Sequence, residues 1–377
     1  MRDRPRGTRE LLAWTLVPKA ALLLLLVAVG LRWSADERHV APRAPGTPAA
    51  VWVLARGWDS NAYQRIALEG YYDEYSRNYP PGYPALIRAA MLLVPEPQVA
   101  AVLVSNLAAL LALLVFARLA RRLAGPDEDL LPAMLVCACL PGLLVWGTVA
   151  YSESCAILLG LLGWTAYLRA EAAGGMRRHA GWLLASGGLF GAAAMMRHVA
   201  GATLLGLGLV ELARVVRAPR GARGRAAGEA LAALATVPLL AVYFVWKFWS
   251  QDLAGVERDL WAMSFVPLGG PASLLEFTDP ETVAVLFLTL PLWGLLGTGL
   301  ARLDVRLLVI ALVTLLMALS FTGIAAQSIN RYAWSAWPLA LGALRLRDRA
   351  ATWALVAVLL LLSAWCGIGH VRGTLAL

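Results

Sequence analysis

The chain has 377 residues, of which 60% are hydrophobic and only 15% are charged. A water-soluble chain of this length would carry about 25% charged residues, so the composition excludes a large soluble domain. The net charge of +9 would suit a nucleic-acid partner, but the arginines gather in alternate loops, which is the pattern that membrane topology produces.

The N-terminal segment carries Arg2, Arg4, Arg6 and Arg9 and continues into an apolar run over residues 11–31. This pattern resembles a signal peptide. The run is longer than a typical hydrophobic signal region, and no small-residue cleavage site clearly follows it. We expect residues 11–31 to be retained as a first membrane span.

The longest polar segment follows, over residues 32–97, and is expected to be the first extracytoplasmic loop. Residues 60–69 are typical of a short amphipathic helix that ends at Gly70. Asp59 directly precedes it, so this carboxylate is either the N-cap of the helix or a functional group. Asp59 and Tyr63 are four residues apart and share one helical face.

Aromatic side chains surround this predicted helix, among them Trp58 and Tyr71. Such a composition suits a helix at the lipid–water boundary. The loop continues with Tyr79-Pro-Pro-Gly-Tyr83-Pro84, which is either a rigid turn or the wall of a site beneath Asp59. The fold class expected is an all-α polytopic membrane protein, one integral membrane domain over residues 1–377.

Apolar segments recur along the rest of the chain, and about 20 such residues are long enough to cross a bilayer. We predict about eleven spans, near residues 11–31, 98–117, 130–147, 154–168, 180–196, 199–216, 230–249, 282–301, 306–322, 332–344 and 351–369. Arginines cluster in alternate connections, near residues 2–9, 118–122, 169–178, 214–225, 302–306 and 345–349. The positive-inside rule places these connections and the N-terminus in the cytoplasm. Residues 180–216 are predicted to form a hairpin, because both flanks are arginine-rich.

Polar groups gather at the opposite ends of the predicted spans. Glu153 precedes one span, Arg197 and His198 separate two, and Arg331 precedes another. A second large loop, over residues 250–280, carries Asp252, Glu257 and Asp259. Ionisable groups at membrane depth are usually functional. The simpler interpretations are that Glu153 caps a helix, that the arginines anchor at the interface, and that the 250–280 acids form a solvated face.

The four cysteines, Cys137, Cys139, Cys155 and Cys366, all lie in apolar segments. This placement indicates neither a disulfide framework nor a zinc site. The sequence shows no cluster of metal-ligand residues and no glycine-rich nucleotide motif, so we predict no metal and no cofactor.

Several segments, taken in order, resemble the PIG-V (GPI mannosyltransferase II) family. They are Trp58-Asp59…Tyr63…Ile66-Ala67…Gly70-Tyr71, the Tyr79–Pro84 segment, Pro141…Tyr151-Ser-Glu-Ser154, Met196-Arg197-His198-x-x-Gly201 and Arg331-Tyr332…Pro338. The Tyr79–Pro84 segment departs from the family's Phe-Pro-x-Tyr-Pro pattern by Tyr for Phe and one extra residue. The resemblance implies a GT-C membrane fold, a polyprenyl-phosphate-mannose donor and α-mannosyl transfer outside the cytoplasm. The Ala/Arg-rich, lysine-poor composition favours a bacterial inner-membrane protein with a glycan or glycolipid acceptor.

The residue chemistry suits such a reaction. A lipid-phosphate sugar already carries a good leaving group, so the reaction needs a base for the acceptor hydroxyl and cations for the departing phosphate. We expect Asp59 to be the base and Arg331, Arg197 and His198 to bind the phosphate. The remaining predicted site residues, which would bind acceptor or wall the site, are Glu153, Tyr63, Tyr79, Tyr83 and Trp58.

Three alternatives stay open from the sequence. The donor could be another lipid-phosphate sugar on the same fold. The chain could also be a membrane transporter or flippase, which would favour polar groups in mid-span, or a non-catalytic partner subunit. The clustering of ionisable groups at the external span ends favours an enzyme.

Overall fold

The computed structural model of the chain describes residues 8–32, 42–73, 75–125, 128–250, 266–276, 280–321, 328–346 and 348–372. These residues form helices and turns, with no β-strand among them. The predictions for Arg2, Arg4, Arg6, Asp252, Glu257 and Asp259 concern residues outside these ranges.

The described residues form long helices and shorter helical segments that connect them. Their bounds are α1 (Thr8–Arg32), α2 (Ala49–Ala55), α3 (Trp58–Glu69), η2 (Tyr75–Asn78), α4 (Gly82–Ala90), α5 (Pro97–Ala124), α6 (Leu131–Cys139), α7 (Pro141–Leu144), α8 (Glu153–Glu171), α9 (Met176–Met196), η3 (His198–Ala200), α10 (Gly201–Arg217), η4 (Arg220–Ala222), α11 (Arg223–Ala233), α12 (Val237–Ser250), α14 (Gly270–Glu276), α15 (Pro280–Leu303), α16 (Val305–Ala318), α17 (Ile329–Ala333), α18 (Pro338–Gly342), η6 (Ala343–Arg345) and α19 (Arg349–Arg372).

Five of the described helices are long and apolar enough to cross a membrane, which supports the prediction of a membrane protein. They include residues Glu10–Arg32, Pro97–Ala124, His198–Arg217, Val283–Leu303 and Arg349–Arg372. A sixth crossing results if α11 and α12, which meet at an angle of 43°, count as one broken span.

Three of the predicted spans are not continuous helices. The segment 230–249 is the broken pair α11 and α12. The segment 130–147 divides into α6 and α7 at Leu140, which adopts an extended backbone because Pro141 follows it. Turns then occupy residues 145–150. The segment 332–344 is instead the end of α17, the short α18 and a 3₁₀ turn. At Leu140 and at residues 334–337 the chain breaks next to residues of the site.

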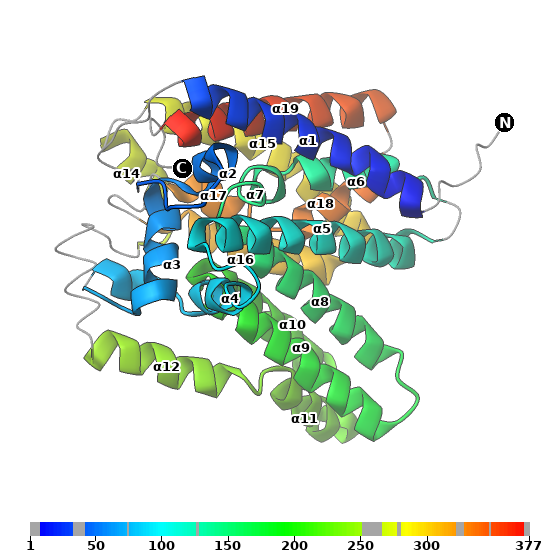
Figure 1. Cartoon of the computed structure of the whole chain (residues 1–377). Coiled ribbons are helices and arrows are strands. Elements are labelled where there is room, and N and C mark those ends of the chain that lie inside the picture. Colours follow the sequence, from blue (N-terminus) through cyan, green and yellow to red (C-terminus); the bar gives the residue numbers. More distant parts are fainter. Residues whose placement is uncertain are drawn as a thin grey trace.

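The last turns of the first and last described helices identify one end of the molecule. Helices α1 and α19 pack side by side (Figure 1). The buried Arg56 donates from Nη2 to the carbonyl oxygens of Gly30 and Val371, at 3.0 and 3.1 Å. Because Gly30 and Val371 lie in the last turns of α1 and α19, the two helices finish at the same end. We call it the site end.

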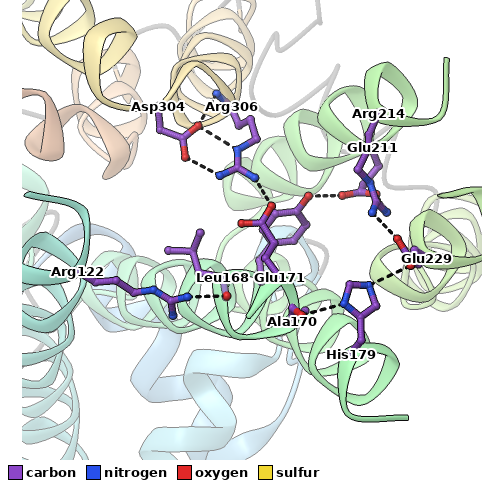
Figure 2. Close-up of polar contacts among 11 residues, drawn as sticks. Arg122, Leu168, Ala170, Glu171, His179, Glu211, Arg214, Glu229, Asp304 and Arg306 are labelled. Carbon is purple, nitrogen blue, oxygen red and sulfur yellow. Dashed lines mark hydrogen bonds and ion pairs between the residues drawn. The ribbon is translucent and has the colours of Figure 1, made fainter. Parts of the chain in front are cut away.

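The opposite end is arginine-rich and is held by its own polar network (Figure 2). Arg214 pairs with Glu211 and Glu229, at 2.5 Å in each case. Glu229 also lies 3.4 Å from His179. His179 is near the start of α9 and Arg214 near the end of α10, so these helices form an antiparallel hairpin, the arrangement expected from their arginine-rich flanks.

Helix α8 connects the two ends of the molecule. Near its last turn, Tyr167 donates to the buried Glu211 across 2.5 Å, and Glu171 pairs with Arg306. Glu153 is its first residue. A helix of this length spans about 28 Å, so Glu153 is far from the arginine-rich network and belongs to the site end.

Candidate functional site

Asp59 lies in the first turn of α3, and its position corrects one prediction. The helix begins at Trp58, two residues earlier than expected, with Gly57 as the N-cap residue and no side-chain cap. Asp59 is therefore inside the helix, and the interpretation that it only caps the helix is wrong. The predicted end at Gly70 is confirmed: its φ is 81° and its N–H donates to the carbonyl of Ile66.

The backbone beside Asp59 is unusual. Gly57 has φ of 92°, and Trp58 has φ of 47°. A left-handed conformation costs an L-residue roughly 1–2 kcal/mol, and Trp58 has no short polar side chain to offset it. Strained residues of this kind cluster at functional sites. This strained backbone leads directly into the first turn of α3, which carries Asp59.

Tyrosines from the loop wall the site on one side of Asp59. Tyr79 donates from its hydroxyl to Oδ1 of Asp59 across 3.1 Å, and the Tyr75 hydroxyl lies 2.7 Å from that of Tyr79. The rings of Tyr79 and Tyr83 both meet Tyr63 edge to face, at centroid distances of 5.0 Å. The Tyr79–Pro84 segment thus lies against Asp59, which is the placement that one of the two sequence interpretations predicted.

A close backbone contact fixes this segment against α9. A Cβ added at Gly82 would lie 2.6 Å from the carbonyl oxygen of Met195. Only glycine fits such an approach. The start of α4 consequently touches the end of α9, two residues before Arg197, so the loop and α9 meet where the charged groups gather.

Glu153 begins α8 in a fully buried position, with none of its surface exposed. The turn before it is held from two sides. The N–H of Ala150 donates to the carbonyl of Leu54 in α2, and Lys19 of α1 donates from Nζ to the carbonyl of Gly147 across 2.8 Å. The Ser152 hydroxyl lies 3.2 Å from that of Tyr63. The α8 start is therefore anchored to the loop and to the first span.

Arg197 and Arg331 reach the site from two breaks in the helical structure. Arg197 has an extended backbone (φ −154°, ψ 125°) between α9 and η3. Arg331 belongs to the five-residue α17, and the turn directly after α17 packs against α7: a Cβ at Gly142 would lie 2.5 Å from the carbonyl oxygen of Trp334. Both arginines are 5% exposed, a level that basic residues seldom reach without partners.

Four charged groups form one continuous ion-pair network. Arg331 Nη1 lies 2.8 Å from Asp59 Oδ2, and Arg331 Nε lies 3.4 Å from Glu153 Oε1. Arg197 Nη1 lies 2.8 Å from the same Glu153 oxygen and 3.4 Å from the Ser152 hydroxyl. The network joins α3, α8, the α9–η3 break and α17.

The network sets the protonation state of Asp59. Burial acts to raise the pKa of its carboxyl, but the charges of Arg331 and Arg197 and the hydrogen bonds from Tyr79 and Arg331 outweigh it. The pKa of Asp59 is held below its ordinary value. Burial first, and then the Asp59 charge, raise the pKa of Tyr79 well above the ordinary value. Asp59 is thus an anion and Tyr79 a neutral donor near pH 7.

Aromatic rings enclose the two guanidinium groups. Tyr332 lies under both, at 4.9 Å from Arg197 and 5.4 Å from Arg331. Trp146 and Tyr151 flank Arg331 at 5.7 and 5.3 Å. The face of an aromatic ring stabilises a cation while leaving the N–H groups of a guanidinium free for oxygen ligands. The arrangement can hold an anion beside a carboxylate, which is what acyl, glycosyl or phosphoryl transfer requires.

The structure brings most of the predicted site residues together, namely Asp59, Arg331, Arg197, Glu153, Tyr63, Tyr79, Tyr83 and Trp58. His198 is the exception. It follows Arg197 as the first residue of η3, and the ion pairs of Asp59 and Glu153 in the described residues do not include it.

His370 is a neighbour that the sequence analysis missed. It is 3% exposed in the last turn of α19, and its ring lies 5.2 Å from Trp146 and 5.1 Å from Tyr151. A single histidine in an otherwise apolar span was the available signal. Trp146 gave no signal, because a tryptophan in an apolar segment is ordinary.

The described residues include no group of three or more His, Cys, Asp or Glu side chains that could hold a metal ion. The two guanidinium groups supply the positive charge at the site. The chain matches no protein-family model, no curated protein and no solved structure.

Proposed function

We propose that the protein is an inverting membrane glycosyltransferase that moves mannose from polyprenyl-phosphate-mannose to a glycan or glycolipid hydroxyl. The observation that supports this most is the pairing of a partly exposed carboxylate, Asp59, with a buried arginine, Arg331, across 2.8 Å. The side chain of Asp59 is 19% exposed, against 5% for Arg331. A base within reach of solvent thus stands next to a cation that suits phosphate.

The proposed reaction uses each group once. The acceptor oxygen attacks the anomeric carbon from the side opposite the phosphate, and its proton passes to Asp59. The bond from the anomeric carbon to the phosphate oxygen breaks, and its electron pair stays on that oxygen. Arg331 and Arg197 stabilise the negative charge that develops there. The products are the α-mannosylated acceptor and polyprenyl monophosphate, and Asp59 later releases its proton to water.

The remaining side chains support these roles. Glu153 fixes both guanidinium groups through a single oxygen, which sets their spacing for one phosphate. Tyr79 holds the other oxygen of Asp59. No nucleotide is needed, because the lipid phosphate is itself the leaving group. Tyr75 and Tyr63 complete the wall on the loop side, where the acceptor sugar would bind.

A purely structural ion-pair network is the competing interpretation, and the arginine-rich end of the molecule offers a comparison. There, Glu211 is fully buried and Arg214 connects it to Glu229, so the network joins helices. The network at the site end differs in two ways. Both of its arginines are buried, with side chains 5% and 6% exposed against 33% for Arg214, and the backbone next to Asp59 is strained at Trp58. Both features favour a functional site.

The finer architecture belongs to the same proposal. We propose a GT-C-like bundle of about eleven spans in a bacterial inner membrane, with a cytoplasmic N-terminus and an extracytoplasmic site. The ordered resemblance to the PIG-V family and the arginine-rich connections support it. The long loop between α1 and α5 carries α2, α3, η2 and α4, which fits a substrate-binding loop.

A donor panel tests the proposal. Membranes that contain the full chain are incubated with radiolabelled polyprenyl-phosphate-mannose, -glucose or -arabinose and a source lysate that supplies acceptor. Membranes without the chain are the control. Transfer from the mannose donor alone is the expected result. Transfer only from another sugar would correct the donor, and no transfer from any donor would count against an enzyme of this class.

A further inference from the structure

The charged groups of the site are balanced before any substrate arrives. Asp59 and Glu153 contribute two negative charges, and Arg197 and Arg331 contribute two positive charges. The phosphodiester of the donor brings one more negative charge. An extra buried charge without a partner is expensive, so phosphate can bind well only if one of the existing pairs opens.

The two carboxylates differ in how easily they can leave. Glu153 has no exposed surface and lies between both arginines, at 2.8 and 3.4 Å. Asp59 is 19% exposed and pairs with one arginine, while Tyr79 holds its second oxygen. A released Glu153 would be a buried, unpaired charge. A released Asp59 keeps the Tyr79 hydrogen bond and meets water.

We infer that Asp59 is the resting occupant of the phosphate site on Arg331. The donor phosphate displaces the Asp59 carboxylate from Nη1 of Arg331, and this exchange frees Asp59 to act as the base. The inference rests on the proposed function and adds an order of events to the proposed reaction: the donor binds first, and only then does Asp59 become available as the base.

The exchange makes Asp59 a stronger base while the donor is bound. Paired with Arg331, the carboxylate holds a proton weakly, since the guanidinium charge favours the anion. A phosphate on Arg331 cancels that charge, and the proton affinity of Asp59 rises while the donor is in place. Without donor, the carboxylate stays neutralised by Arg331 and does not activate water or acceptor.

The same competition resets the site after transfer. Asp59 then carries the acceptor proton, and polyprenyl monophosphate remains on the arginines with its additional charge. When Asp59 loses the proton to water, its carboxylate competes again for Arg331. The returning ion pair therefore favours release of the lipid phosphate, and a variant that lacks this carboxylate should hold the product more tightly.

Equilibrium binding of farnesyl monophosphate to the purified full-length protein in detergent tests the inference. Wild type is compared with Asp59→Asn, which removes the competing charge, and with Asp59→Ala if the first variant does not fold. Glu69→Gln is the matched control, because it removes the same charge from the same helix at an exposed pair with Arg65. Farnesol, which lacks the phosphate, reports binding of the chain alone.

The expected result is about tenfold tighter farnesyl monophosphate binding by Asp59→Asn, equivalent to about 1.4 kcal/mol, with farnesol binding and the Glu69→Gln variant unchanged. If Asp59→Asn binds the phosphate no more tightly while Arg331→Gln loses it, the exchange is wrong and the phosphate clamp stands. If no variant distinguishes farnesyl monophosphate from farnesol, both the clamp and the exchange fail. If the expected pattern appears but no donor supports transfer, the exchange stands and the transferase function fails.

Discussion

Arg197 and Glu153 form an ion pair of 2.8 Å in which the side chains are only 6% and 0% exposed. The pair joins the end of α9 to the start of α8, and the same Glu153 oxygen lies 3.4 Å from Arg331. Breaking a buried pair from one side is costly, because the remaining charge keeps its desolvation penalty. The Glu153 carboxylate should consequently be a main stabilising group of the site end.

Replacement of Glu153 by glutamine should destabilise the protein by about 3–5 kcal/mol. Among the described residues, Arg197 would keep the Ser152 hydroxyl, at 3.4 Å, and the Tyr332 ring. Thermal unfolding of the detergent-purified protein measures the change. Glu69→Gln, which opens an exposed pair, should stay within about 0.5 kcal/mol of wild type. Equal stability of the two variants would show that Glu153 is not a structural counter-ion.

Lysine at position 331 should keep the charge and lose the function. Arg331 contacts Asp59, Glu153 and Ser328 through three different nitrogens, and an ammonium group cannot reproduce that planar fork. We expect kcat/KM for transfer to fall about 100-fold, a loss of roughly 2.7 kcal/mol of transition-state stabilisation. Steady-state kinetics in membranes measures it. A tenfold or smaller loss would mean that a point charge is sufficient.

Phenylalanine at position 79 should shift the pH dependence of transfer. The Tyr79 hydroxyl donates to Asp59 and favours the carboxylate, so it is one cause of the lowered Asp59 pKa. Removing it raises that pKa, so Asp59 becomes protonated at a higher pH. The acid limb of the kcat/KM profile, which reports the free enzyme, should therefore move to higher pH. Tyr75→Phe is the control. The Tyr75 hydroxyl contacts that of Tyr79, so its removal should move the acid limb less than the removal of the Tyr79 hydroxyl. An unmoved acid limb in Tyr79→Phe would exclude Asp59 as the titrating base.

Alanine at Gly142 should separate the two segments that support Arg331. Its Cβ would lie 2.5 Å from the carbonyl oxygen of Trp334, a backbone atom that cannot turn away. We expect a loss of 1–3 kcal/mol in stability, typical of overpacking, together with reduced transfer. Gly188→Ala is the control, since a Cβ there meets nothing within 4 Å. If Gly142→Ala unfolds at the wild-type temperature, the close packing of α7 on the turn after α17 is wrong.

Part of the site could be predicted because its signals are local. The apolar pattern and Gly70 defined the end of α3, and the Arg197-His198 pair inside an apolar stretch marked the break between α9 and α10. The observation that polar groups share the outer ends of spans was sufficient to group Asp59, Glu153, Arg197 and Arg331.

The missed features depend on the tertiary structure. The start of α3 was misplaced because Trp58 adopts a positive φ, which no residue pattern announces for tryptophan. The breaks within 130–147 and 332–344 were missed because hydropathy alone does not separate a span from short buried helices. Lys19 falls within the predicted span 11–31, and its hydrogen bond to the Gly147 carbonyl could not be predicted, because it depends on the contact between α1 and the turn before α8.

The most direct test compares transfer of radiolabelled mannose from polyprenyl-phosphate-mannose by wild type and by Asp59→Asn in membranes with equal amounts of folded protein. Asparagine has nearly the shape of aspartate and can accept the Tyr79 hydrogen bond, but it is no base. We predict that wild type transfers mannose and that the variant loses at least 100-fold in rate. Undiminished transfer by Asp59→Asn would contradict the central claim that the carboxylate paired with Arg331 takes the acceptor proton.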